Sequence, residues 1–523
     1  MPSALPPPTD CDVAVVGCGP TGLVTAILLA QRGHRVTVLE RWREPYPLPR
    51  AVHFDAEIGR VLQSCGIGEE LRSLIEPADV YEWRNAAGVT LLRFGLIGDS
   101  PTGWPIASMF CQPELEALLE RRARSLPGLE IRRGVAVDRL QQHDDHVTVG
   151  ITDGGEVSAR YVVGADGARS TVRDLLGIEM IDLGYFYDWF VVDVVLHEPR
   201  VYDPVNLQVC DPARPTTVVS GGPGRRRWEF MRLPGEDPEL FNTEAHAWEL
   251  LAPWDVTPDN ARMERCADYR FHARYARRWH DRRVFLAGDA AHQTPPFAGQ
   301  GLCAGVRDAA NLAWKLDLVL AGHAGEGLLQ DYDHERIEPA RAVIEFAMDL
   351  GKVICVPDPA EAAARDALMA AAVTDELAVV GGLPGITAGC IATGTPHAGE
   401  RFVQGAIGGV PFDDVHGAGW RLVTVDPAGD TPDLAGDLTG DLTGDVAGEA
   451  QAWFTAIGGR VVALDEAEPA TVQRRWFTEH GCTWALQRPD FHLFGTAADA
   501  VEAEQLLNRL RAALGAPTKE CMT

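Results

Sequence analysis

The residues with the clearest chemical pattern form a glycine-rich turn near the start of the chain, Gly17-Cys18-Gly19-Pro20-Thr21-Gly22. Gly17 permits a tight turn, Gly19 lets the backbone approach a pyrophosphate, and Gly22 lets a helix pack closely on a strand. Glu40 follows 18 residues after Gly22. There its carboxylate can accept hydrogen bonds from both ribose hydroxyls of an adenosine and would repel a 2′-phosphate. These residue types at this spacing indicate a dinucleotide site.

The elements that must position this turn are predicted on both sides of it. Residues 13–16 form the continuous apolar run of a buried parallel strand, a helix continues to Arg32, and residues 36–39 form a second strand. The N-terminus of that helix offers free N–H groups and a positive dipole end to phosphates. A glycine turn in an unrelated α/β fold is the alternative. Gly222-Pro223-Gly224 lacks a third glycine, so we expect a hairpin turn there and one permanent dinucleotide site.

The composition excludes several classes of partner. Asp and Glu number 75 against 47 Lys and Arg, giving a formal net charge of −28, which would repel nucleic acid and anionic membrane surfaces. The apolar stretch at 23–30 is far shorter than the ~20 residues of a membrane-spanning helix. No Lys or Arg precedes Arg32, so a signal peptide is not expected. The eleven cysteines form no CxxC pair, which predicts free thiols, no metal site and a cytoplasmic location.

Two further strand–turn motifs occur later in the chain. Residues 161–163 run into Gly164-Ala165-Asp166-Gly167, and residues 284–286 run into Ala287-Gly288-Asp289-Ala290-Ala291-His292. With the first turn, they resemble the class A flavoprotein aromatic hydroxylases of the p-hydroxybenzoate hydroxylase fold. The longer match through residues 295–301 and 307–316 looks like the 3-(3-hydroxyphenyl)propionate hydroxylase branch and related polyketide hydroxylases.

The resemblance covers about residues 1–380 and implies an α/β fold. A discontinuous Rossmann-like FAD-binding domain would comprise residues 1–75, 100–178 and 280–380. An inserted antiparallel-sheet substrate-binding domain would comprise residues 76–99 and 179–279. Strand-like runs at 189–196, 217–220 and 227–233, broken by Gly and Pro, independently indicate that antiparallel sheet.

The last third of the chain is predicted to form a small α/β domain. A strand at 421–425, a helix at 448–457, a strand at 460–464 and a helix at 497–514 alternate there. Residues 381–400 read as a linker, and residues 429–449 as an acidic Gly/Asp loop. By resemblance, with Leu486–Asp490 as its strand motif, residues 401–517 form a thioredoxin-like domain. Because it lacks CxxC and Cys482 stands alone, we expect a structural or dimer-associated role without redox activity.

The resemblance also implies which residues contact FAD. Asp289 would hydrogen-bond the ribityl chain, and the helix after Gly299-Gln300-Gly301 would direct its dipole toward the flavin pyrimidine edge. Asp166, Gln112 and Arg50 would also contact the cofactor. For each residue there is an alternative role: a simple strand-to-helix turn for Asp166, a helix cap for Gln112 and a surface position for Arg50. The full set of cofactor-binding candidates is Gly17, Gly19, Pro20, Thr21, Gly22, Glu40, Arg41, Arg50, Gln112, Asp166, Asp289, Pro296, Gly299, Gln300, Gly301 and Leu302.

The activity that the resemblance implies is oxygen insertion. NADH or NADPH would reduce FAD, dioxygen would add at flavin C4a, and the hydroperoxide would hydroxylate a phenolic or other electron-rich ring. The expected partners are therefore a small phenolic substrate and O2, and the chain could form a homodimer. An epoxidase or Baeyer–Villiger-type tailoring oxygenase of a polyketide is the alternative on the same fold. A flavin-binding protein that has lost catalysis is a third interpretation.

The substrate pocket is the least determined part of the sequence. His53 is a candidate base for the phenol, and Pro296 and Phe297 are candidates for the flavin-facing wall. Tyr185, Tyr187 and Trp189 share one strand face and could contact the substrate, although core packing is favoured. We expect Arg225-Arg226-Arg227 at a solvated hairpin tip and His292 in a role that holds the Gly288-Asp289 loop. No dedicated carboxylate clamp is evident.

Overall fold

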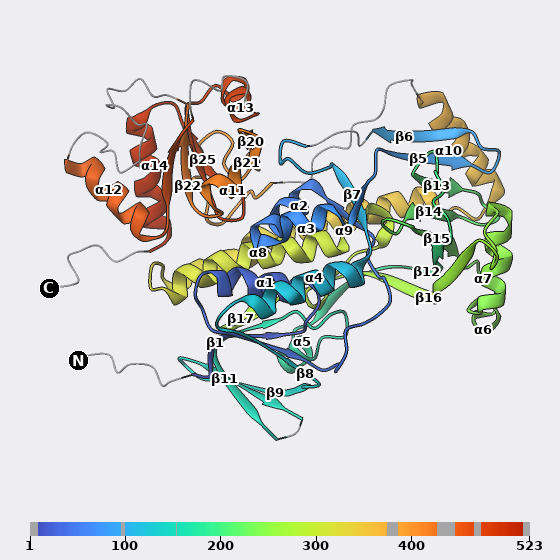
Figure 1. The fold of residues 1–523 in the computed structure, drawn as a ribbon, viewed down its shortest axis with the longest axis horizontal. Coiled ribbons are helices and arrows are strands. Elements are labelled where there is room, and N and C mark those ends of the chain that lie inside the picture. Colours follow the sequence, from blue (N-terminus) through green and yellow to red (C-terminus); the bar gives the residue numbers. More distant parts are fainter. Residues whose placement is uncertain are drawn as a thin grey trace.

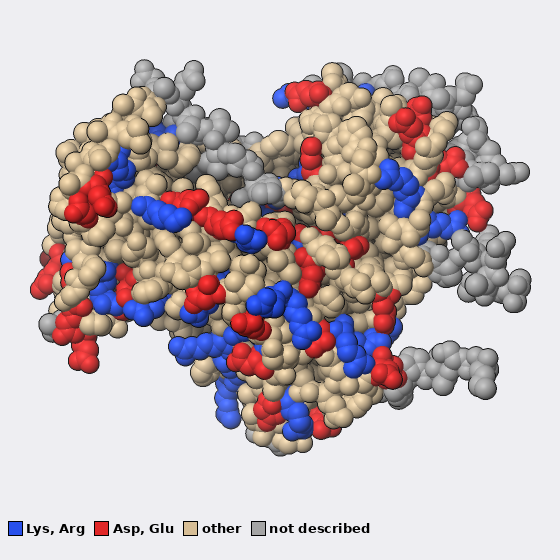
Figure 2. Space-filling view, turned by 180° about the vertical axis from the view of Figure 1, so that it is seen from behind, with Lys and Arg blue, Asp and Glu red and all other residues tan. Residues whose placement is uncertain are grey.

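The computed structural model describes residues 9–95, 100–152, 154–373, 385–425, 445–464 and 472–515. Three units lie side by side (Figure 1): a parallel sheet with its helices, an antiparallel sheet, and a smaller C-terminal unit. None of the helices in these ranges is both long and apolar enough to cross a bilayer. Acidic and basic side chains are interspersed on the face shown in Figure 2, without a large region of one sign.

The parallel sheet is built around β1, which pairs with β2 on one side and β11 on the other. Its apolar residues are buried, as the continuous apolar run predicts. The strand order is β17 (His280–Asp281), β18 (Val284–Leu286), β11 (Glu156–Gly164), β1 (Cys11–Val16), β2 (Val36–Glu40) and β8 (Leu129–Arg133), with β10 (Val147–Ile151) and β9 (Val137–Gln142) attached at β11.

The helices of this unit are α1 (Pro20–Gln31), α2 (Ala56–Leu62), α3 (Gly68–Arg72), α4 (Gln112–Ser125), α5 (Thr171–Leu175), α8 (Gly301–Leu320), α9 (Asp331–Ile354) and α10 (Pro359–Ala372). A small sheet of β3 (His53–Asp55), β7 (Ala107–Phe110) and β4 (Ile75–Pro77) adjoins them. Helix α8 is buried along nearly its whole length and crosses the middle of the molecule.

The antiparallel sheet is centred on two long strands, β12 (Met180–Leu196) and β16 (Ala261–Ala276). It confirms the strands expected at 189–196, 217–220 and 227–233. Its order is β19 (His292–Gln293), β16, β12, β15 (Arg225–Met231), β14 (Thr216–Ser220), β13 (Asn206–Cys210), β5 (Val80–Asn85) and β6 (Thr90–Gly95), and α6 (Pro238–Phe241) and α7 (Glu244–Leu251) lie beside it. The expected hairpin turn at Gly222–Gly224 joins β14 to β15.

The C-terminal unit has a four-stranded sheet in the order β23 (Arg460–Ala463), β22 (Arg421–Thr424), β24 (Trp484–Gln487) and β25 (Leu493–Ala497). Its helices are α11 (Phe412–His416), α12 (Asp445–Ala456), α13 (Val472–His480) and α14 (Ala500–Ala513), with a hairpin of β20 (Ala406–Ile407) and β21 (Val410–Pro411). The predicted strands and helices at 421–425, 448–457, 460–464 and 497–514 are confirmed within a few residues. Most of the Gly/Asp loop and the start of the linker lie outside the described residues.

A buried ionic network joins the C-terminal unit to α8 and α9. Arg488, in the turn between β24 and β25, contacts Glu335 of α9 and Asp490, each at 2.6 Å. Lys315 of α8 lies 2.7 Å from the same Glu335 carboxylate. Burial alone would raise the pKa of Glu335, but Arg488 and Lys315 lower it to about 2. The charges are therefore paired, and each depends on its partners.

Replacing Arg488 tests the contribution of this network. Arg488→Met leaves Asp490 and part of Glu335 as uncompensated buried charge, which should lower the free energy of unfolding by about 3–5 kcal/mol. Arg124→Met, which removes an exposed i,i+4 pair with Glu120, is the control and should change it by less than about 0.5 kcal/mol. Denaturant-induced unfolding measures both, and equal midpoints for the two variants would contradict the role assigned to Arg488.

Candidate active site

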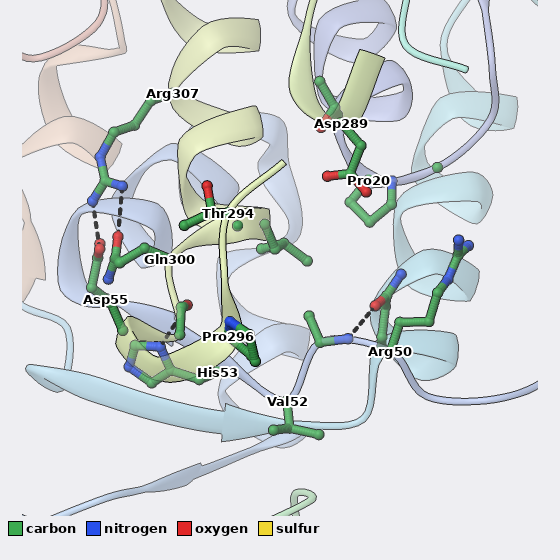
Figure 3. Close-up of a pocket in the computed structure, with 18 of the residues that line it drawn as sticks. Pro20, Arg50, Val52, His53, Asp55, Asp289, Thr294, Pro296, Gln300 and Arg307 are labelled. Atoms are coloured by element: carbon green, nitrogen blue, oxygen red, sulfur yellow. Dashed lines mark hydrogen bonds and ion pairs between the residues drawn. The ribbon is translucent and has the colours of Figure 1, made fainter. Parts of the chain in front are cut away.

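A cavity of about 1630 Å³ lies between the parallel sheet and the antiparallel sheet. At one end it is lined by the glycine-rich turn before α1 and by Glu40, and at the other by side chains of β5, β12, β13 and β14. The segment from Thr294 to Leu302 borders it between these ends. Figure 3 shows this middle part, with Asp289, Pro20, Arg50 and His53 among the lining residues.

The glycine-rich turn has the geometry that its sequence predicts. Gly17 has φ +108°, and a Cβ there would lie 2.3 Å from the carbonyl oxygen of Ala165. A Cβ on Gly22 would lie 2.1 Å from the carbonyl oxygen of Gly17, so the close helix–strand contact requires glycine. A Cβ on Gly19, by contrast, would meet no protein atom within 4 Å. The space beside Gly19 is thus available to a ligand.

The N-terminus of α1 has free hydrogen-bond donors. Gly19 is the N-cap residue, no side chain caps the helix, and its first turn carries no acidic residue. The first N–H groups of a helix bind anions well under these conditions. Glu40 completes this end, because its carboxylate accepts hydrogen bonds from the backbone N–H of Cys18 at 2.8 Å and of Trp42 at 2.9 Å. Two acceptor positions per oxygen leave Glu40 able to bind a ribose as well.

Cys18, between the two glycines, is buried and lies with its Sγ 3.4 Å from the Arg133 guanidinium. Burial raises the pKa of the Cys18 thiol to about 12, although Arg133 opposes the shift. The thiol therefore stays protonated and behaves as a small apolar side chain.

The Asp289 carboxylate has no hydrogen-bond donor among the described residues. It lines the cavity and is exposed to it, and desolvation by the surrounding protein raises its pKa, although His292 and Arg50 oppose the shift. The loop beneath it is fixed by Asp308 of α8, which accepts hydrogen bonds from the Gly288 N–H at 3.0 Å and from His292 at 2.6 Å. The expected role of His292 in holding this loop is confirmed. Asp289 itself remains available to a ligand hydroxyl.

Asp166 and Gln112 both border the cavity, but each is also engaged with protein. The Asp166 carboxylate accepts hydrogen bonds from the Ser170 hydroxyl at 2.5 Å and the Val172 N–H at 3.1 Å, and burial raises its pKa. These contacts favour the simple turn as the role of its carboxylate. Gln112 accepts a hydrogen bond from the Ala51 N–H at 2.6 Å, which holds the segment that carries Arg50. The N-cap of α4 is Cys111, so Gln112 is not the helix cap.

The segment 296–301 positions His53. The Gly299 carbonyl oxygen lies 3.2 Å from His53 Nδ1, and a carbonyl can only accept, so Nδ1 carries the proton and Nε2 keeps its lone pair. Burial lowers the pKa of His53, which favours the neutral ring. Arg307 of α8 donates to the Gln300 side chain at 2.9 Å and contacts Asp55, as Figure 3 shows. The backbone around Gly299 is thereby fixed from both sides.

Of the three aromatic residues Tyr185, Tyr187 and Trp189 on β12, one borders the cavity and two are packed in the core. Trp189 lines the cavity and meets Phe297 edge to face, with ring centroids 5.7 Å apart. Tyr185 and Tyr187 do not border the cavity; they pack with Phe271 in a neighbouring apolar cluster. The substrate role proposed for these two tyrosines is therefore not supported, because both rings are packed in that apolar cluster. The other cavity residues near Trp189 include Tyr81, Trp83, Phe94, Met109, Asn206, Gln208 and Thr217.

The expectation of a solvated tip at Arg225–Arg227 is wrong. These residues begin β15, and Arg226 and Arg227 are each only 3% exposed. Arg227 is paired with Asp193 at 2.6 Å, and its other nitrogens donate to the Pro49 and Arg50 carbonyls. Residue spacing alone gave no sign of this arrangement, because Asp193 lies on the adjacent strand β12. The pair fixes the backbone of Arg50, whose guanidinium lies 4.8 Å from the ring centroid of Tyr46.

The remaining cofactor-binding candidates are placed consistently with one long ligand. Pro20, Thr21, Arg41, Pro296, Gln300, Gly301 and Leu302 all line the cavity. Gly22 does not line it and acts through helix packing instead. A free helix N-terminus, an acid with open acceptor positions and an unengaged carboxylate along one cavity fit FAD, with the aromatic end left for a second molecule. This arrangement defines a flavoprotein oxidoreductase.

Comparisons with known proteins give the same class. Residues 10–347 match the family described as FAD binding domain. A probable NADH-specific resorcinol 4-hydroxylase of Rhodococcus jostii (strain RHA1) is 39% identical over 96% of this chain and 95% of its own. A 3-(3-hydroxy-phenyl)propionate/3-hydroxycinnamic acid hydroxylase of Mycolicibacterium gilvum (strain PYR-GCK) is 37% identical over 70% of this chain and 64% of its own. The structure of aklavinone-11 hydroxylase with FAD and aklavinone superposes with a TM-score of 0.76 at 28% identity, covering 97% of this chain and 99% of that one.

The chain belongs to this FAD-binding family. It is an FAD-dependent monooxygenase of the aromatic hydroxylase class, with a nicotinamide nucleotide as its reductant.

Gly19→Ala separates ligand binding from folding. The added methyl meets no protein atom within 4 Å. When both proteins are free of FAD, the variant should therefore have the same free energy of unfolding as the wild type. After purification, the FAD content of the variant should be lower than that of the wild type by a factor of roughly ten or more. The reason is that the methyl occupies the space where the pyrophosphate must approach the backbone. Flavin absorbance per chain measures this.

The control is Gly325→Ala. Gly325 has a similar extended backbone (φ −76°, ψ 157°, against −83°, −176° at Gly19) and equally open space around it. It should keep full FAD content. Equal FAD content in the two variants would show that the pyrophosphate does not lie at Gly19.

Proposed function

We propose that the protein hydroxylates a small uncharged phenol of the resorcinol class, with NADH as the preferred reductant. Support comes from the near full-length similarity to the resorcinol 4-hydroxylase and from the aromatic end of the cavity. The observation that carries the proposal is that three of the four arginines of the antiparallel sheet that border the cavity are already paired with aspartates.

The four arginines of the antiparallel sheet that border the cavity illustrate this. Arg227 pairs with Asp193, Arg270 with Asp188 at 2.7 Å and Arg274 with Asp182 at 2.8 Å, while Arg265 donates to the Pro49 carbonyl. A substrate carboxylate at Arg227, Arg270 or Arg274 would have to displace the aspartate already paired there and leave it without its partner. A neutral phenol makes no such demand.

The polar groups at the aromatic end suit a hydroxylated ring. The Thr217 hydroxyl donates to Gln208 Oε1 at 2.6 Å, and the Tyr81 hydroxyl lies 3.4 Å from the same oxygen. Trp83, Phe94 and Trp189 supply apolar surface around them. The ring would be held mainly by aromatic contacts, with few hydrogen bonds fixing its orientation.

When bound, FAD supplies hydride acceptance and the activation of dioxygen. The chain supplies position and proton transfer. His53 is neutral, with Nε2 as its acceptor, and can take the phenol proton, which raises the electron density of the ring. Trp189 and Phe297 exclude water from the same region.

The roles of the other units follow from this function. We infer that the antiparallel sheet forms the substrate-binding domain inserted into the FAD-binding domain. The C-terminal order, a parallel β22–β23 pair followed by antiparallel β24 and β25, supports a thioredoxin-like domain without CxxC. A cytoplasmic location and a homodimer remain predictions from the sequence.

The experiment that tests the substrate class compares resorcinol with 3-(3-hydroxyphenyl)propionate. Resorcinol should accelerate NADH oxidation more than the carboxylated phenol does, and NADH should serve better than NADPH. The product should gain one oxygen atom with its ring intact, which also separates hydroxylation from ring-expanding or epoxide-forming chemistry. Acceleration by the carboxylated phenol alone would overturn the proposal.

His53→Gln tests the base. Removing a general base should lower kcat/KM for the phenol by roughly 10²-fold or more while leaving FAD content unchanged. Because burial lowers the pKa of His53, the ring stays neutral to lower pH than a free imidazole does. Wild-type kcat/KM should therefore fall only at pH values below the usual histidine range, and the variant should lack that acid limb.

His272→Gln is the matched control, since His272 also borders the cavity but lies on β16. It should retain the acid limb and most of the activity. If the limb disappears in His272→Gln and persists in His53→Gln, the assignment of the base is wrong.

A further inference from the structure

Two histidines and a carboxylate converge at the edge of the C-terminal unit. His397 and Glu400 lie in the segment before β20, and His480 is the last residue of α13. One ligand atom from each, a ring nitrogen or a carboxylate oxygen, can be chosen so that all three lie within 4.8 Å of one another. Neither the hydroxylase reaction nor FAD binding uses these residues.

The tautomer of His480 is fixed in the form that binds a metal. Its Nδ1 lies 2.7 Å from the Trp476 carbonyl oxygen, and a carbonyl can only accept a proton, so Nδ1 carries the hydrogen. Nε2 of the neutral ring then has its lone pair free. A histidine ligand whose second nitrogen donates to a backbone carbonyl is the usual arrangement at metal sites in proteins.

The other two groups are already close to coordination spacing. His397 Nδ1 lies 3.2 Å from both carboxylate oxygens of Glu400. Bonds of about 2.0 Å and tetrahedral angles place two zinc ligands about 3.3 Å apart. Closing the remaining separation to His480 requires a movement of no more than about 1.5 Å, which side-chain rotation can supply.

The backbone holds the segment in an uncommon conformation. His397 has φ +58°, in the left-handed region, which costs a non-glycine residue of order 1 kcal/mol or more. Hydrogen bonds from Gly399 N–H to the Leu493 carbonyl at 2.8 Å and from Glu400 N–H to the His397 carbonyl at 3.1 Å fix the turn. His480 is stacked on Trp476, with ring centroids 4.2 Å apart. The donor groups are thus held in place by packing and by the main chain.

We propose that His397, Glu400 and His480 bind one divalent transition-metal ion, with Zn²⁺ favoured and water in the fourth position. Two imidazoles and one carboxylate are a ligand set typical of zinc sites with an open position. Glu400 and His480 also line the large cavity, so the ion would lie at its wall. The ion would tie the segment before β20 to the end of α13.

The test uses tag-free, full-length protein with FAD bound, treated with a chelator and dialysed. Co²⁺ serves as the spectroscopic probe and Zn²⁺ is titrated by calorimetry. The wild type should bind one ion per chain and melt at a higher temperature in its presence, because an ion that binds only the folded state stabilises it.

Three variants each remove one ligand. His480→Gln, His397→Asn and Glu400→Gln should each weaken binding at least roughly tenfold without changing FAD content. Asparagine is chosen at 397 because it tolerates the left-handed region. His334→Gln is the control, since His334 has a carboxylate neighbour, Asp331, but lies outside the cluster; it should bind like the wild type.

Failure of the wild type to bind either ion would overturn the proposal, and so would unchanged binding in the three variants. Either outcome would leave the two histidines as packing partners of Trp476. Glu400 is exposed, so Glu400→Gln keeps the test decisive even if a histidine variant does not fold.

Discussion

The buried carboxylate of Asp308 is the interaction on which the active site most depends. It accepts from the Gly288 N–H and from His292 on one side and from Arg336 at 2.9 Å on the other. Its neighbours on α8 connect the same helix to the rest of the molecule. Arg307 holds Gln300 and Asp55, and Lys315 pairs with Glu335 toward the C-terminal unit. One helix therefore sets the positions of the Asp289 loop, the backbone near His53 and the interdomain contact.

Much of the FAD end could be predicted from the sequence, because each property there is local. A glycine with positive φ, an apolar strand and an acid at the end of the next strand all fall within 30 residues of one another. Asp289 and Gln300 are cofactor-binding candidates through a resemblance and not through spacing. The strands and helices predicted for the C-terminal unit are present in the structure, because the spacing of apolar residues directly indicates which side of an element is buried.

The substrate end could not be predicted in the same way, because it depends on which strands become neighbours. The period of two correctly put Tyr185, Tyr187 and Trp189 on one face of β12, but the sequence did not show where along that face the cavity ends. The burial of Arg226 and Arg227 cannot be predicted from the sequence for the same reason. Their burial follows from the pairing of β15 with β12, which brings Arg227 opposite Asp193.

The thiol of Cys18 has a consequence for the durability of the enzyme. Each of the ten free cysteines in the described part of the chain has a pKa raised, chiefly by burial. Oxidants attack the thiolate and scarcely touch the protonated sulfur. An oxidant such as hydrogen peroxide would thus find few reactive sulfurs in this part of the chain. The burial that packs the core therefore also makes these thiols slow to oxidise.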